Sequence, residues 1–123
     1  MIRGLGVDFV SIGRIERWRQ RPGILERFFH PQELEATRRR GPAQAASLAA
    51  RFAAKEAFGK ALGTGLAGFS LREVSVVNDE HGQPHLRLAG RALQCLAASG
   101  GSRTLVSLTH DHDYALAVVV IEE

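Results

Sequence analysis

One long helix most constrains what this chain can fold into. The alanine-rich segment from Ala43 to Leu62 predicts that helix, and Gly63-Thr64-Gly65 predicts its end in a glycine turn. Within it, Glu56 and Lys60 are four residues apart and share a face with Phe52. A carboxylate and an ammonium beside a large apolar side chain indicate a site that handles both a cation and an anion. The alternative is an exposed ion pair worth about 0.2–0.5 kcal/mol.

The segments around this helix predict a mixed fold. Strands are expected over Ile2 to Asp8, within Phe69 to Val77, and over His85 to Leu88, Thr104 to Thr109 and Tyr114 to Ile121. Further helices are expected from Ile12 to the stop at Pro22-Gly23, over Ile24 to Phe29, from Pro31 to Arg40 and over Gly90 to Ala98. This order predicts an α+β fold, with an antiparallel sheet packed on the long central helix. Residues 1–123 hold no linker or repeat, so we expect a single domain.

The composition is that of a soluble globular protein. Hydrophobic residues make up 45% of the chain and charged residues 24%, and no apolar run is long enough to span a bilayer. Cys95 is the only cysteine, which excludes an intrachain disulfide and a cysteine-based zinc site. The first residues lead directly into a strand and show no signal-peptide pattern. These features favour the cytosol and no membrane association.

Positive charge is concentrated in the first half of the chain. Residues 1–60 hold 12 of the 16 Lys and Arg residues but only 6 of the 13 acidic ones. A basic half of this kind favours an acidic partner, which could be a nucleic acid, a phosphate-rich small molecule or an acidic protein. Charge alone does not choose among them.

Two carboxylates are candidate metal ligands. Asp8 is expected at the end of the first strand, where it could ligate a metal or cap the next helix. Together with Glu56 it would supply two hard oxygen ligands, which suits Mg²⁺ when substrate phosphates and waters complete the shell. Lys60 could meet a phosphate as a point charge. Gly63-Thr64-Gly65 follows a helix and lacks P-loop spacing, so its glycines indicate a cap that could let a ligand approach the backbone.

Basic side chains elsewhere suggest contacts with anions. His110 ends a predicted strand and could donate a hydrogen bond to a phosphate, whereas His112 is expected in a solvated turn. Arg14, Arg17 and Arg21 are spaced as one helix face, which is either a solvated basic face or a docking surface for an acidic helix or phosphates. No interleaved aromatic pattern accompanies these arginines, which makes nucleic acid the weaker option.

Three segments together resemble the holo-(acyl carrier protein) synthase family of 4′-phosphopantetheinyl transferases. They are Gly6 to Ile15, Arg51 to Ala61 with its continuation Gly63-Thr64-Gly65, and Ser107 to His110 followed by Tyr114 to Ala117. Their order and spacing match over nearly the whole chain. The resemblance implies a Mg²⁺-dependent enzyme of fatty acid biosynthesis. It would move the phosphopantetheine arm of coenzyme A onto a serine of apo acyl carrier protein and release adenosine 3′,5′-bisphosphate.

The resemblance also assigns roles to residues. It implies that Asp8 and Glu56 hold Mg²⁺ on the pyrophosphate, and that Lys60 neutralises phosphate charge and is a candidate proton donor to the leaving group. The coenzyme A contacts are expected from Arg51, Lys60, Gly63, Pro84 and His110, with Pro84 at the adenine pocket. Arg14, Arg17 and Arg21 are expected to dock the acidic helix of the carrier protein.

Other implications leave alternatives open. The family is typically a homotrimer whose sites are shared between neighbouring chains, and the sequence does not assign residues to protomers. The base that takes the serine proton is Glu56 through a metal-bound water, or Glu33 or Glu35. A carrier domain of a specialised pathway is an alternative partner. Nucleic-acid binding by a non-catalytic module is an alternative function, but it gives Asp8 and Glu56 no role.

Overall fold

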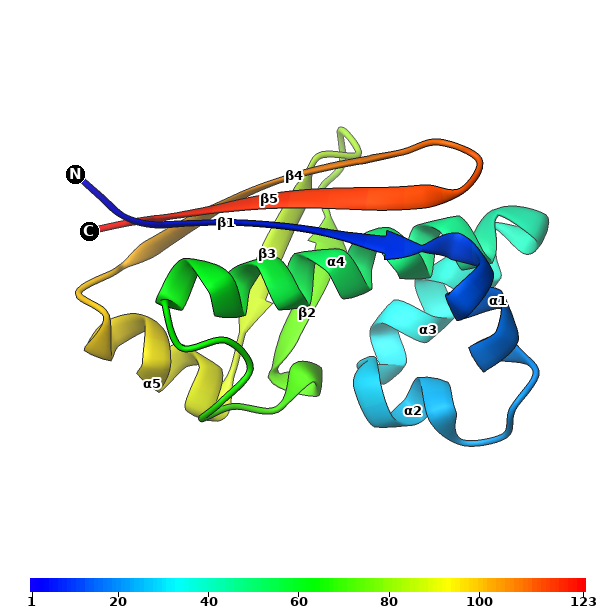
Figure 1. Ribbon diagram of the computed structural model, residues 1–123, viewed down its shortest axis with the longest axis horizontal. Coiled ribbons are helices and arrows are strands. Elements are labelled where there is room, and N and C mark those ends of the chain that lie inside the picture. Colours follow the sequence, from blue (N-terminus) through cyan, green and yellow to red (C-terminus); the bar gives the residue numbers. More distant parts are fainter.

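A single long helix, α4 (Gln44–Leu62), runs through the middle of the molecule in the computed structural model, which describes residues 1–123 (Figure 1). The strands are β1 (Ile2–Ser11), β2 (Val74–Asn78), β3 (Pro84–Leu88), β4 (Arg103–His110) and β5 (Tyr114–Glu122). The other helices are α1 (Ile12–Arg19), α2 (Ile24–Phe28), α3 (Pro31–Arg38) and α5 (Gly90–Ala98), with short 3₁₀ turns η1 (Gly41–Ala43) and η2 (Leu71–Glu73). The prediction of an α+β fold is confirmed.

Two separate antiparallel sheets lie against α4. The larger has the strand order β1-β5-β4 and covers one side of the helix (Figure 1). The smaller is the β2–β3 hairpin, which makes no strand pairing with the larger sheet. Helices α1, α2 and α3 gather at one end of α4, and α5 lies at the other. No helix combines the length and the apolar character that a membrane crossing requires.

The strand β1 runs along α4 in the opposite direction, with their backbones in contact (Figure 1). A Cβ atom at Gly4 would lie 2.0 Å from the carbonyl oxygen of Ala61. A Cβ atom at Gly6 would lie 2.0 Å from the carbonyl oxygen of Ala57. Only glycine permits this approach. The two glycines therefore bring the rest of β1, which includes Asp8, against the C-terminal half of α4.

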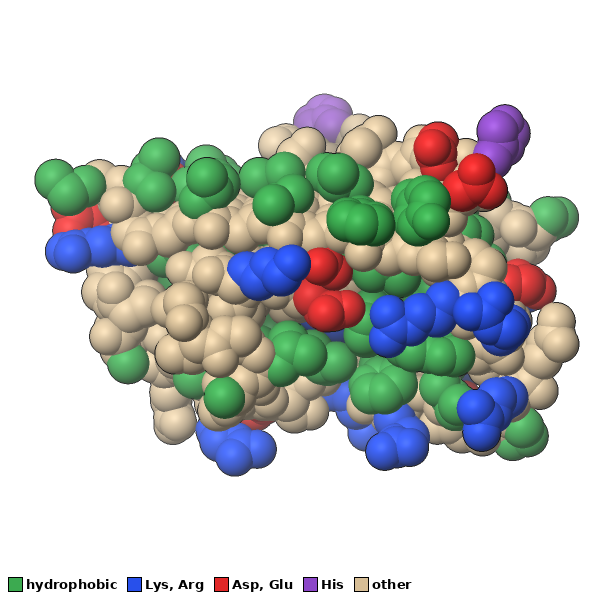
Figure 2. Space-filling view, in the orientation of Figure 1, with side chains coloured by type: hydrophobic (Ala, Val, Ile, Leu, Met, Phe, Trp, Pro, Cys, Tyr) green, Lys and Arg blue, Asp and Glu red, His purple; other side chains and the backbone are tan.

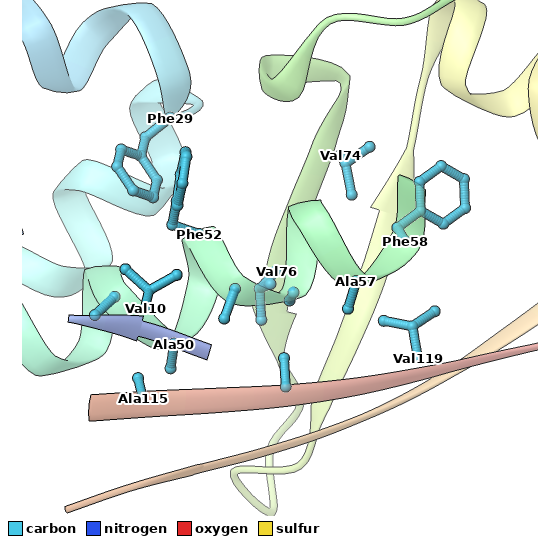
Figure 3. Packing of buried hydrophobic residues seen from close by; sticks show 14 of the residues in the cluster. Val10, Phe29, Ala50, Phe52, Ala57, Phe58, Val74, Val76, Ala115 and Val119 are labelled. Atoms are coloured by element: carbon cyan, nitrogen blue, oxygen red, sulfur yellow. The ribbon is translucent and has the colours of Figure 1, made fainter. Parts of the chain in front are cut away.

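The core forms where the larger sheet meets α4. Alternate residues of β5, from Ala115 to Ile121, are fully buried and face the helix. Figure 3 shows Ala115 and Val119 beneath α4, with Phe52 and Phe58 projecting from the helix on its other side. Val74 and Val76 of β2 complete the core from the smaller sheet. Since both sheets pack on it, α4 is buried on nearly all sides.

The outer face of the larger sheet is also apolar. Leu5, Val7 and Phe9 of β1 are 50–67% exposed, and Leu105 of β4 and Tyr114 of β5 are each 50% exposed. Figure 2 shows hydrophobic side chains in a row along this side of the molecule. An extended apolar patch on a sheet face marks an interaction surface.

Two expectations about element ends are wrong. The strand β1 does not end at Asp8 but continues to Ser11, because the apolar Phe9 and Val10 keep pairing with β5. Asp8 therefore does not cap the next helix; Ser11 does so, accepting a hydrogen bond from the Arg14 amide at 3.3 Å. Helix α1 ends at Arg19, before the Pro22-Gly23 stop, so Arg21 lies in the turn beyond it.

Candidate active site

Lys60 of α4 contacts Asp8 of β1. The Lys60 Nζ donates hydrogen bonds to Asp8 Oδ1 at 2.9 Å and to the Val7 carbonyl oxygen at 3.1 Å. The contact with Asp8 raises the pKa of Lys60. The surface ion pair between Glu56 and Lys60 that the helix spacing allowed does not form, because β1 places a carboxylate closer to the ammonium.

Glu56 lies beside this pair and is half-buried. Burial raises the pKa of its carboxyl, and the charge of Asp8 raises it further, while Arg14 and Lys60 oppose the shift. Two carboxylates thus repel each other at a site with limited access to water. A divalent cation would relieve that repulsion. No third His, Cys or acidic side chain joins them, so phosphate oxygens and waters would have to complete a Mg²⁺ shell, as this ion prefers.

Aromatic rings hold Arg14, whose charge acts on Glu56. The Arg14 guanidinium lies 4.9 Å from the ring centre of Trp18 and 5.5 Å from that of Phe52. Phe28 packs on Trp18 with ring centres 5.0 Å apart. The cation–π contacts hold Arg14 at the edge of the acidic pair. Arg17, on the same helix, is exposed.

A second group of expected residues lines a cavity of about 380 Å³ between α4, the β2–β3 turn and β4. Arg51, Pro84 and His110, expected to contact the nucleotide, all lie on its wall. Its other polar lining residues are Arg40, Ser47, Asn78, Gln83, Ser107 and Thr109. The volume is within the range of small-molecule sites, and the two arginines make the cavity suitable for an anionic ligand.

Arg51 is held firmly in the wall of this cavity and is only 4% exposed. Its Nη1 donates to the Val76 carbonyl oxygen at 2.5 Å, and its Nε donates to Ser47 Oγ at 3.4 Å. Burial lowers the pKa of Arg51, and the nearby Glu33 carboxylate opposes that shift while Arg40 adds to it. The guanidinium is therefore fixed in place before any ligand binds.

The acidic pair and the cavity lie on different sides of α4. Five residues of helix separate Arg51 from Glu56, which turns their side chains about 140° apart around the helix axis. The cavity lining includes none of Asp8, Glu56 and Lys60. One chain therefore presents two separate groups of candidate site residues, for which we use the name half-sites.

The structure does not bring every expected residue to these half-sites. Gly63 caps α4 with a φ of 83° and lies next to Lys60, but it is outside the cavity. Glu35 is exposed on α3, where its carboxylate faces Arg38 and Arg39 at 3.8 and 3.6 Å. Glu35 joins neither half-site within the chain.

The sequence does not predict the ion pair between Glu33 and Lys55. Glu33, an alternative candidate for the base, is 1% exposed and lies 2.7 Å from the Lys55 ammonium. Both of its carboxylate oxygens accept hydrogen bonds inside the protein. The one available signal was the position of Lys55 in α4, one turn from Arg51 and surrounded by Ala and Phe.

Comparison with known proteins gives a consistent result. Residues 4–119 match the model of the 4′-phosphopantetheinyl transferase superfamily. The chain is 53% identical, over 99% of both chains, to the holo-[acyl-carrier-protein] synthase of Treponema denticola. It is similar to the crystal structure of holo-[acyl-carrier-protein] synthase from Neisseria meningitidis, with a TM-score of 0.89 and 38% identity over 100% of both chains. The Bacillus anthracis synthase in complex with CoA (3′,5′-ADP) gives a TM-score of 0.83 and 32% identity, over 100% of this chain and 98% of that one.

Proposed function

The chain belongs to the 4′-phosphopantetheinyl transferase superfamily, and on that premise we propose that it is a holo-(acyl carrier protein) synthase. It transfers the 4′-phosphopantetheine group of coenzyme A to a serine of apo acyl carrier protein and releases adenosine 3′,5′-bisphosphate. The observation that carries this proposal is the close packing of β1 along α4 at Gly4 and Gly6, which brings Asp8, Glu56 and Lys60 together.

The reaction requires charge neutralisation more than a strong nucleophile. The serine oxygen forms a bond to the phosphorus that carries the pantetheine arm, and the bond from that phosphorus to the bridging oxygen of the pyrophosphate breaks. Negative charge builds up on the leaving adenosine bisphosphate. The side chain of Lys60 is 54% exposed, so its ammonium can turn from Asp8 toward that phosphate.

The two carboxylates fit Mg²⁺, and we propose that Asp8 and Glu56 hold it. The fit rests on the chemistry of two neighbouring carboxylates: burial raises the pKa of Glu56, and the charge of Asp8 raises it further. When bound, the ion would neutralise charge on the pyrophosphate. We also assign the serine proton to Glu56, acting through a water, because Glu56 is the candidate acid that lies beside Asp8 and Lys60. Glu33 is engaged inside the protein and Glu35 faces arginines on another helix.

The cavity is proposed to bind the nucleotide end of coenzyme A. Arg51 and His110 would contact its phosphates, and Pro84 would contact its adenine. All three residues line this one cavity, whose volume suits a small molecule. Gly63 would allow the backbone near Lys60 to approach the pyrophosphate, because no atom lies within 4 Å of the place where a side chain would begin.

The two half-sites support an assembly in which neighbouring chains complete each other. We propose a homotrimer in which the acidic pair of one protomer faces the cavity of the next. The apolar outer face of the larger sheet supports this, because Leu5, Val7 and Phe9 would be removed from water in such an assembly. The geometry of α4 supports it as well, since Arg51 and Glu56 point in different directions.

The carrier protein is proposed to dock beside the acidic pair. Arg14 and Arg17 of α1 present positive charge there, and Arg21 adds a third arginine in the turn that follows. An acidic helix would match this charge. We further propose that this carrier protein belongs to fatty acid biosynthesis. We also propose that the reaction is cytoplasmic, which the single cysteine favours.

Release of the second product tests this proposal. The protein, coenzyme A, Mg²⁺ and apo acyl carrier protein should together yield adenosine 3′,5′-bisphosphate, resolved by chromatography. A carrier protein with alanine in place of its acceptor serine should yield none. Equal release from both carriers would indicate hydrolysis of coenzyme A and contradict a transferase.

A further inference from the structure

The β2–β3 hairpin supplies one wall of the cavity yet is not part of the larger sheet. Asn78 ends β2 and Pro84 begins β3, and both line the cavity. Since no strand pairing ties the hairpin to β1, β5 or β4, side chains must set its position relative to α4. Apolar contacts of Val74 and Val76 supply part of this attachment, but such contacts are non-directional and do not fix register.

Two cations of α4 bind the backbone of β2 at matched spacing. Lys55 Nζ donates to the Val74 carbonyl oxygen at 2.5 Å, and Arg51 Nη1 donates to that of Val76 at 2.5 Å. Four residues along a helix span about 6 Å, and two residues along a strand span about 6.6 Å. The spacing of Arg51 and Lys55 along α4 therefore matches the spacing of the Val74 and Val76 carbonyl groups along β2.

The Glu33 carboxylate completes this arrangement from α3. Its Oε1 accepts from Lys55 Nζ at 2.7 Å, and its Oε2 accepts from the Val76 amide at 3.0 Å. The Val76 peptide is thus held on both sides, at its N–H by Glu33 and at its carbonyl by Arg51. A third hydrogen bond, to the Leu71 carbonyl oxygen at 3.0 Å, uses the last proton of the Lys55 ammonium.

Burial of these charges is expensive and gives little net stability by itself. Lys55 is 0% exposed and Glu33 is 1% exposed. Replacing a buried ion pair of this kind by apolar residues is often neutral or stabilising in proteins. Directed hydrogen bonds to one peptide can, however, fix register, which apolar packing does not. Burial lowers the pKa of Lys55 and Glu33 opposes that shift, so removal of Glu33 would leave an uncompensated cation.

We propose that Glu33 and Lys55 are positioning residues for the nucleotide cavity, which they shape by fixing Val76 and, through it, Arg51 and the Asn78–Pro84 end of the hairpin. This inference rests on the proposed function. Neither residue lines the 380 Å³ cavity, so neither is a catalytic residue. In the β2–β3 pairing, Asn78 lies opposite Pro84 and Val76 lies opposite Leu86. The fixed peptide is therefore two residues from the cavity wall.

The variant Glu33→Gln tests the inference, because it keeps the shape of the side chain and removes its charge. Calorimetry would measure binding of adenosine 3′,5′-bisphosphate well below the Tm of each protein. We expect the Kd to rise at least 10-fold. In turnover assays the KM for coenzyme A should rise while the KM for the carrier protein stays unchanged. A wild-type Kd in a folded but destabilised Glu33→Gln would overturn the inference.

A matched control separates positioning from loss of stability. Leu96→Ala opens a core cavity in α5, away from the hairpin end, and should lower the Tm without changing the nucleotide Kd. An equal rise in Kd in both variants would show that general loosening is the cause and would overturn the positioning role. Absence of nucleotide binding by the unmodified protein is a different result, because it would contradict the proposed function itself.

A measurement on the unmodified protein covers the case in which Glu33→Gln does not fold. Hydrogen exchange would be followed with and without adenosine 3′,5′-bisphosphate. We expect the nucleotide to slow exchange at the amides of β2 and β3, including Val76, because a ligand in the cavity would stabilise the anchored hairpin. Slowing confined to α4 and β4, with β2 and β3 unchanged, would overturn the inference.

Discussion

Lys60 and Asp8, 52 residues apart in the sequence, are joined by a hydrogen bond of 2.9 Å between the Lys60 ammonium and Asp8 Oδ1. The same carboxylate is a proposed metal ligand. An ammonium and a divalent cation therefore compete for it, and binding of the metal would free Lys60 to meet a phosphate.

Lys60→Met should therefore bind Mg²⁺ more tightly, by several-fold, and turn over more slowly. The substitution removes both the competing partner of Asp8 and a repulsive charge near the metal. Titration calorimetry with Mg²⁺ alone, without coenzyme A, measures the first effect. Arg91→Met removes an exposed cation from α5 and should leave Mg²⁺ affinity unchanged. Weaker Mg²⁺ binding in Lys60→Met would contradict the competition.

Glu56→Gln should lose turnover and become more heat-stable. The pKa of Glu56 is raised in the folded protein, mainly by burial, so the folded state holds this proton to higher pH than the unfolded chain does. Stability therefore falls as pH rises through this range. Glutamine removes that loss, so the Tm of the variant should exceed that of the parent at neutral pH, and the difference should shrink in acid. Thermal unfolding over a pH series measures it, and near-normal turnover would remove Glu56 from the site.

Arg17→Glu should raise the KM for acyl carrier protein by about 10-fold or more and leave the KM for coenzyme A unchanged, as expected when one charge of an electrostatic interface is reversed. Arg17 is a cleaner choice than Arg14, whose charge also acts on Glu56. The control Arg91→Glu makes the same charge change on α5. Equal changes in both KM values would argue against a docking role for α1.

Phe9→Asp should dissociate the assembly and abolish activity, because it places a charge in the proposed apolar interface. Phe9 is 65% exposed in the single chain and its ring meets that of Tyr114 edge-on, so the fold should survive its replacement. Sedimentation velocity would report the change in mass, and circular dichroism would verify the fold. An active monomer would contradict shared sites.

Mixed assemblies provide an independent test of shared sites. Arg51→Ala and Glu56→Gln should each be inactive alone. In trimers reassembled from an equal mixture, about a quarter of the sites would combine an intact acidic half with an intact cavity half from its neighbour. Activity should therefore return to about that fraction of the parent. No recovery from a mixture shown to contain mixed trimers would place both halves of each site in one chain.

The sequence predicts the scaffold better than the contacts. The long helix, its end at Gly63 and the pairing of the last two strands around His110-Asp111-His112-Asp113 follow from local composition and turn residues, and the structure confirms them. Their signals are local, so a single sequence contains them. The resemblance predicts that Arg51, Pro84 and His110 contact coenzyme A, and the strand-end position of His110 also suggests a phosphate contact; the structure places all three at one cavity.

Contacts between distant segments could not be predicted in this way. Nothing local shows that Lys60 pairs with Asp8 rather than Glu56, because the outcome depends on the close packing of β1 along α4 at Gly4 and Gly6. Nothing local shows that Lys55 pairs with Glu33, because that contact follows from the packing of α3 and β2 around α4. In each case tertiary packing overrides the local pattern.

The most direct test of the central claim is the intact mass of apo acyl carrier protein after incubation with this protein, coenzyme A and Mg²⁺. We predict a gain of one phosphopantetheinyl group, lost when a chelator is added and absent with Glu56→Gln. An unchanged carrier mass, from folded protein and with several carrier proteins, would contradict the transferase and favour the binding-module alternative.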